Sequence, residues 1–329
     1  MIDVAHTRRP LLLVLADARD DEDFALLFPA LREHGVDAVR CDPRDLVTRI
    51  EDGRLRFSIP GGDVEPALVL GWVLEELLVP GMVALELFVE AGISVVNDAA
   101  TLFRAENKLL DSARLAAAGA AHHGVLSARD PADLLAWMER GHADVVVKPL
   151  SGYGGEGIAH IDGEKTRRRW LDSREETQEP YLVMPYVETG GRDIRVYTIN
   201  HHPVFAMYRY APEDSFVTNV LAGGSIAMCP LTAELSDLAA RASRAAGTLI
   251  GGIDIGEEAS TGDLIVFEVN SCPSLEPAVI DDVASFLAAT VHDRADALRT
   301  WTPSHVHRER DDDPALFHES KRGLIRNLR

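Results

Sequence analysis

The sequence predicts an α/β (α+β) fold in which a small parallel α/β domain precedes two regions that mix helices with antiparallel strands. Short apolar runs alternate with helical segments over about the first hundred residues, as in a parallel sheet covered by helices. A glycine-rich loop then stands between two strand-like runs, and two pairs of strands with short turns follow it.

Four strands and two helices are expected in the first hundred or so residues. Apolar or β-branched runs mark the strands, while an acidic stretch and glycines mark the ends of the helices. The strands are expected at 11–16, 36–40, 67–70 and 93–96. The helices are expected from 20–23 to Gly35 and from 83 to 90.

The middle region begins with a helical region expected from residue 97 or 98 to 118, closed by Gly119. A short strand at 125–126 precedes a second helix, which starts at Asp130-Pro131 because proline suits the first helical position. Further strands are expected at 145–148, 158–161 and 181–184.

The last region is predicted to contain two pairs of antiparallel strands and two helices. The strands are expected at 193–199, 203–209, 251–255 and 264–269, and the helices at 234–249 and 279–298. The predicted division of the chain is 1–100, 101–187 and 188–300, with a polar tail at 301–329.

The composition is that of a globular protein, with 46% hydrophobic and 26% charged residues. The net charge of -20 repels nucleic-acid phosphates and anionic membranes, so neither is expected as a partner. No stretch approaches the roughly 18 apolar residues of a membrane helix. The three cysteines lie far apart and form no C-x-x-C pair, which fits a cytoplasmic protein.

The run from Gly152 to Gly157 matches G-x-G-x-x-G. A dinucleotide-binding turn needs a helix after it, whereas residues 158–161 read as a strand, so the loop is predicted to cover phosphates as a flap. A protein-kinase loop is excluded because Lys148 lies upstream and because H-R-D and D-F-G are absent. Taken alone, the loop fits a plain tight turn equally well.

Oxygen donors gather on the two expected strands 251–255 and 264–269. Glu268 and Asn270 lie two residues apart on or just beyond one strand and therefore share a face. Asp254 interrupts an apolar strand, where a carboxylate is costly unless it is paired or metal-bound. If the strands pair, the three side chains converge and predict an Mg²⁺ or Mn²⁺ site. The alternative is a salt-bridged carboxylate beside a turn asparagine.

In this order the features resemble the ATP-grasp superfamily, and most closely its RimK-type branch of amino-acid (glutamate) ligases. The resemblance runs from about residue 70 to 295. It depends on eight segments: 106–110, 145–150, 151–158, 181–187, 191–195 with Arg209 after it, 219–224, 252–255 and 267–273.

The resemblance implies an ATP-grasp fold, in which ATP lies between the two α+β regions. Cationic side chains would bind the phosphates, and the strand at 181–187 would bind adenine through the Pro185 carbonyl and the Val187 N–H. The implied nucleotide-binding residues are Lys108, Lys148, Ser151, Gly154, Gly155, Met184, Pro185, Val187, Asp193 and Arg195.

The resemblance also implies three catalytic residues, Arg195, Arg209 and Asn219, and a metal site that holds two ions on Asp254, Glu268 and Asn270. Arg209 would stabilise the acyl phosphate or the later oxyanion. The alternatives are a solvent-exposed helix charge at Lys108 and structural ion pairs at the two arginines.

The activity implied is ATP-dependent ligation of a carboxylate to an amine through an acyl phosphate. An amino acid, with glutamate the leading candidate, would be joined to a small amino-acid-like molecule. The alternatives are a small-molecule kinase, a ligase that modifies a protein or carrier-protein tail, and a binding protein without catalysis. A homo-oligomer, dimer or tetramer, is expected from relatives. Val217, Ala222 and Ser274 replace residues common in the family, so unusual substrates are expected.

Overall fold

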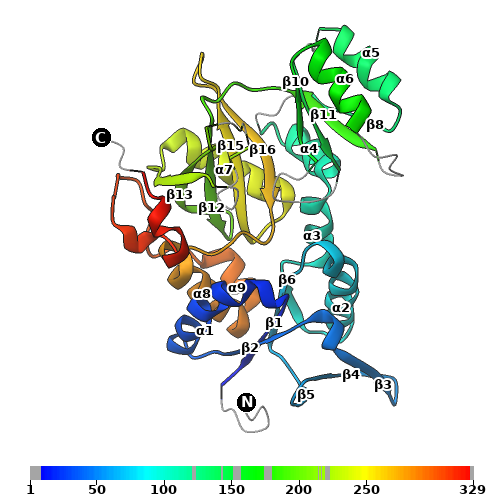
Figure 1. Cartoon of the computed structure of the whole chain (residues 1–329). Helices are drawn as coiled ribbons and strands as arrows, with labels where there is room; N and C mark the ends of the chain where they lie inside the picture. The colour runs from blue at the N-terminus through cyan, green and yellow to red at the C-terminus, as the bar shows by residue number, and fades with distance from the viewer. Residues whose placement is uncertain are drawn as a thin grey trace.

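The computed structural model describes residues 9–120, 124–141, 144–150, 157–173, 180–213, 215, 217–218 and 223–326. In Figure 1 these residues form an N-terminal unit in blue and cyan at the base, a smaller green unit at the upper right and a yellow-green sheet in the centre. The predicted α/β (α+β) fold class is confirmed. Over the described ranges, no helix is long and apolar enough to span a membrane.

The N-terminal unit contains a sheet of four parallel strands in the order β2-β1-β6-β7. Alternate residues of β1 pack against helix α1 and helix α2, on opposite faces of the sheet. This burial on both faces explains the continuous apolar sequence of the strand. The elements are β1 (Leu11–Ala16), α1 (Asp21–Glu33), β2 (Asp37–Cys41), β6 (Leu68–Trp72), α2 (Leu78–Glu90) and β7 (Ser94–Val96).

A separate antiparallel sheet of three strands lies beside α2 and was not expected from the sequence. Its strands carry many charged residues and no continuous apolar run, so they give no strand signal of the buried kind. Phe57 attaches this sheet by stacking on Phe88 of α2, with 4.1 Å between the ring centroids. The strands are β3 (Val47–Glu51), β4 (Arg54–Ile59) and β5 (Gly62–Val64). The N-terminal unit also contains three short 3₁₀ segments: η2 (Ala18–Asp20), η3 (Pro43–Asp45) and η4 (Glu75–Leu77).

The helical region expected from residue 97 or 98 to 118 is present and consists of two helices, α3 (Ala99–Glu106) and α4 (Lys108–Ala117). The break falls at Asn107, whose side chain accepts a hydrogen bond from the Leu110 N–H at 3.1 Å. Asparagine caps helices well by bonding to the amides of the first turn. The cap places Lys108 at the start of α4.

The green unit is an antiparallel sheet in the order β10-β9-β11-β8 with two helices on it. Helix α6 was not expected, because its sequence is dominated by charges and buries only Trp170. The elements are β8 (Leu126–Ala128), α5 (Pro131–Glu139), β9 (Val145–Pro149), β10 (Ala159–Ile161), α6 (Glu164–Ser173) and β11 (Tyr181–Pro185).

The central sheet has five antiparallel strands in the order β14-β13-β12-β15-β16. Helix α7 covers one face, and helix α8 covers part of the other. Ile194 and Val196 face α7, so Asp193 and Arg195 point to the opposite side. The elements are β12 (Arg192–Ile199), β13 (His202–Tyr210), β14 (Ser225–Met228), α7 (Ala233–Ala246), β15 (Ile250–Glu257), β16 (Leu264–Asn270) and α8 (Pro277–His292).

The helix expected at 279–298 also differs from the structure, which has α8 followed by α9 (Arg294–Thr300). Asp293 separates them and caps α9 by accepting from the Asp296 N–H at 3.0 Å. As with Asn107, a short polar side chain ends one helix and starts another.

The segment after Trp301, expected as a polar tail, packs on the central unit over residues 302–326. Phe317 is 1% exposed and belongs to the main core, and Lys321 forms an ion pair with the buried Glu276. The Arg326 N–H donates to the Ile226 carbonyl at 2.7 Å, at the edge strand β14. A few apolar residues anchor an otherwise polar segment. Because they are so few, the composition of the segment predicted a tail rather than a packed segment. Two 3₁₀ segments lie here, η6 (Pro314–Leu316) and η7 (Glu319–Leu324).

Asn97 joins the N-terminal unit to the central sheet. Its amide nitrogen donates to the carbonyls of Ile250 and Ser271 at 2.8 and 2.9 Å, and its amide oxygen accepts from the Leu249 N–H at 2.7 Å. Asn97 is 1% exposed, so water cannot replace these bonds if they are lost.

We predict that Asn97→Ala lowers the free energy of unfolding by about 3 kcal/mol or more, because several buried backbone groups lose their partner. Asn107→Ala is the control, since it removes only a helix cap worth about 1 kcal/mol. Urea unfolding followed by circular dichroism measures both. An Asn97→Ala variant no less stable than Asn107→Ala would contradict the assignment.

Candidate functional site

Strand register brings distant residues into one row on the face of the central sheet opposite α7. Arg195 of β12 pairs with Asp254 of β15, which pairs in turn with Glu268 of β16. Arg209 of β13 pairs with Asp193 of β12 on the same face. Four strands therefore contribute charged side chains to a single surface.

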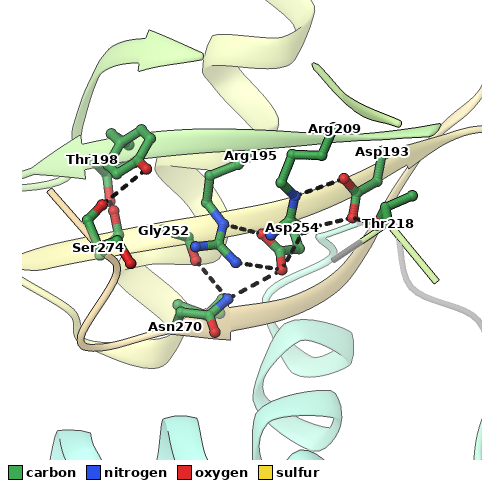
Figure 2. Close-up of polar contacts among 12 residues, drawn as sticks. Asp193, Arg195, Thr198, Arg209, Thr218, Gly252, Asp254, Asn270 and Ser274 are labelled. Carbon is green, nitrogen blue, oxygen red and sulfur yellow. Dashed lines mark hydrogen bonds and ion pairs between the residues drawn. The ribbon is translucent and has the colours of Figure 1, made fainter. Parts of the chain in front are cut away.

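Two arginines converge on one buried carboxylate. Arg195 binds both oxygens of Asp254, and Arg209 reaches Asp254 Oδ2 at 2.9 Å. Figure 2 shows the three side chains pointing toward one another between β12, β13 and β15. Gly252 makes room for this contact, because a Cβ atom there would lie 2.8 Å from Arg195 Cδ.

The three side chains of this cluster keep one another in their charged forms. Burial alone raises the pKa of Asp254, but the guanidiniums of Arg195 and Arg209 bring it down to about 2. Despite burial, the pKa of each arginine is raised above its usual value, with Asp254 contributing in both cases. Arg195 and Arg209 are therefore both positively charged at neutral pH.

Asp193 is the second partner of Arg209. Arg209 Nε donates to Asp193 Oδ1 at 2.8 Å, and Thr218 Oγ1 donates to Asp193 Oδ2 at 2.7 Å. Burial raises the pKa of Asp193, and Arg209 opposes this rise. Asp193 thus orients Arg209 in the structure, while its expected contact with a nucleotide stays a prediction.

The three expected metal ligands lie together. Asp254 pairs with Glu268, and the Asn270 amide nitrogen donates to Asp254 Oδ2 at 3.3 Å. Across the residues described, no group of three or more His, Cys, Asp or Glu side chains is placed to hold a metal. The set here contains two carboxylates and one amide, which are the hard oxygen donors that suit Mg²⁺. Glu268 and Asn270 fit such an ion in their chemistry, whereas Asp254 would have to share an oxygen between the metal and its two arginines. The role of all three as ligands stays a prediction.

Lysines approach the same site from other elements. Lys148 of β9 is 6% exposed, and burial lowers its pKa, with Glu268 raising it and Lys108 lowering it further. Both Glu268 and Lys108 therefore lie within electrostatic range of Lys148. The Lys108 N–H also donates to the Leu150 carbonyl at 3.0 Å, which ties the start of α4 to the end of β9.

The expected adenine-binding strand is β11. Met184 is buried, Pro185 pairs with Val145 at the end of the strand, and Val187 lies buried just beyond it. The adenine contacts of these three residues stay predictions. Ser151, Gly154, Gly155 and Asn219 were also expected in the site and lie outside the described residues.

Two residues at the site were missed by the sequence analysis. Tyr197 lies two positions after Arg195 on the same face, and its hydroxyl donates to the Ser274 carbonyl at 3.0 Å. The period of two that runs from Asp193 through Arg195 points to it. Thr218 gave no comparable signal, because its contact with Asp193 spans a loop.

Comparison with known proteins agrees with this arrangement. Residues 105–288 match the RimK-like ATP-grasp domain family. A tetrahydromethanopterin:alpha-L-glutamate ligase from Methanosarcina acetivorans is 34% identical over 185 residues, covering 52% of this chain and 57% of the relative. A probable alpha-L-glutamate ligase from Nitrosococcus oceani is 32% identical over 228 residues, covering 68% of this chain and 75% of the relative. The match thus spans less than two thirds of the first relative's length.

Solved structures share the fold. The ATP-grasp ligase PsnB complexed with minimal precursor has a TM-score of 0.66 and 17% identity, covering 87% of this chain and 99% of PsnB. PsnB complexed with minimal precursor, Mg and ADP gives a TM-score of 0.64 and 17% identity, covering 88% of this chain and 99% of PsnB. The structures show the shared fold, and the matched domain together with the Nitrosococcus relative shows that the chain belongs to the RimK-like ATP-grasp family.

Proposed function

We propose that the chain is an ATP-dependent carboxylate–amine ligase that works through an acyl phosphate. The observation that carries the proposal is the meeting of Arg195, Arg209 and Asp254 with Glu268 on one sheet face. The buried Lys148 of β9 interacts electrostatically with Glu268, which supports its assignment to the same site. Such a site offers cations to phosphates and oxygen donors to a divalent ion, which together suit phosphoryl transfer.

The reaction has two steps. A carboxylate oxygen of the first substrate attacks the γ-phosphorus of ATP, and ADP leaves. The nitrogen of the amine then attacks the acyl carbon, phosphate leaves and the nitrogen loses a proton, which gives an amide.

Each charged residue has a role in these steps. Lys148 and Lys108 hold the phosphates of ATP in line with the attacking carboxylate. Arg209, fixed by Asp193 and Asp254, stabilises negative charge on the acyl phosphate and on the oxyanion of the second step. Arg195 adds a second cation beside it. Magnesium, bound by Asp254, Glu268 and Asn270, would neutralise charge on the phosphates.

Glutamate is the leading candidate for the amino acid, since the two relatives carry glutamate ligase names. A small amino-acid-like molecule is proposed as the other substrate. PsnB was also solved with the precursor peptide PsnA2 and AMPPNP, so a peptide or protein tail is the second candidate. Two metal ions, a dimer or tetramer and a cytoplasmic location stay predictions.

We predict that Glu268→Gln lowers ADP formation at least about 100-fold, because one anionic oxygen donor is lost. Glu257→Gln is a matched control on the neighbouring strand, where Glu257 accepts from Arg192 at 2.7 Å outside the site. A coupled ADP assay measures both variants. Turnover by Glu268→Gln within threefold of the wild type would remove the metal assignment.

The mass of the product separates the proposed activities. With ATP, Mg²⁺ and pairs of amino acids, we expect a product equal to the sum of two substrates minus water. A phosphorylated final product would instead indicate a kinase. Ligation only when a peptide is supplied would favour the second candidate. If no pair of amino acids and no peptide stimulates ADP release, the ligase proposal is contradicted.

A further inference from the structure

Helix α4 lies between the two sheets that contribute to the site. Its first residue bonds to the Leu150 carbonyl at the end of β9, and its middle contacts β16 (Figure 1). One helix therefore touches both the strand that carries Lys148 and the strand that carries Glu268.

Asp111, one turn after Lys108, makes the contact with β16. Its Oδ2 accepts from the Val269 N–H at 2.9 Å. Val269 stands between Glu268 and Asn270, and β16 is the edge strand of the sheet. An edge strand leaves alternate amides without a strand partner. Asp111 binds one of these amides at the point where the strand presents its oxygen donors.

Burying a carboxylate to bind the Val269 N–H carries a cost in free energy. Asp111 is 2% exposed, and its Oδ1 is buried without a hydrogen-bond partner among the described residues. Burial raises the pKa of Asp111 to about 7, although the Val269 N–H and Lys148 oppose the rise. Because a buried carboxylate with an unpaired oxygen is costly, the geometry that Asp111 imposes on β16 explains this contact better than a gain in stability does.

We propose that Asp111 is a positioning residue that fixes β16 against α4 and so sets the distance from Lys108 to Glu268 and Asn270. The inference deepens the proposed function and rests on it. If β16 shifts by a fraction of an ångström, the oxygen donors no longer match the phosphates that the lysines hold. Substitution of residues that support metal ligands typically lowers metal affinity by about 10- to 100-fold.

The experiment compares Asp111→Ala and Asp111→Asn. Asparagine keeps an acceptor oxygen of the same reach, whereas alanine has none. Arg114→Ala is the control, since it removes a 2.7 Å hydrogen bond from the same helix to the Ala245 carbonyl rather than to β16. Binding of ADP in the presence of Mg²⁺ is measured by calorimetry, and hydrogen exchange of the Val269 amide reports the bond itself.

We expect Asp111→Ala to weaken Mg²⁺-dependent ADP binding about 10-fold or more and to speed exchange at Val269. Asp111→Asn should stay within about threefold of the wild type in both measurements, and Arg114→Ala should leave both unchanged. Unchanged binding by Asp111→Ala with faster exchange would overturn the inference. If Asp111→Ala does not fold, a tenfold loss in Asp111→Asn would overturn it. A wild-type chain that binds no ADP would instead refute the proposed function.

Discussion

The buried ion pairs among Arg195, Arg209 and Asp254 are the interaction on which the site depends. Charges out of water are tolerated only when they are paired with good geometry, and losing one partner typically costs about 3–5 kcal/mol. The sheet satisfies this requirement through register alone, because β12, β13 and β15 bring the three side chains to one point. In the described part of the central unit, α7 packs on the opposite face of the sheet and α8 packs on part of the face that carries these side chains.

Pairing two cations with Asp254 is not an efficient way to stabilise a fold, since apolar residues of similar size often do as well or better. It is an efficient way to hold two guanidiniums rigidly beside a group that carries negative charge only during a reaction. Asp193 and Thr218 extend the same restraint to the far side of Arg209. If the proposed reaction is correct, this rigidity serves the chemistry rather than the stability of the fold.

Local sequence patterns predicted the part of the site that depends on them. Glu268 and Asn270 share a face because of the strand period, and Asp254 stood out as a carboxylate in an apolar strand. Contacts set by long-range register or loop position could not be predicted in this way. They include the bond from Thr218 to Asp193 and the bond from Val269 to Asp111, whose partners are separated by 25 and 158 residues.

The fold shows the same limit. Apolar runs predicted the four strands of the parallel sheet and four of the five strands of the central sheet, but they missed the edge strand β14. The charged β3 to β5 and α6 also gave little apolar signal. The helix breaks at Asn107 and Asp293 depend on single capping bonds that a periodic pattern passes over. Phe317 shows that one buried ring can decide whether a polar segment packs.

The proposed nucleotide site lies between β9 and the face of the central sheet that carries Glu268. A crystal structure with a non-hydrolysable ATP analogue and Mg²⁺ tests this most directly. We expect the phosphates between Lys148 and Glu268, with adenine beside Pro185 and Val187. A nucleotide bound elsewhere, with Lys148 and Glu268 both away from its phosphates, would contradict the account.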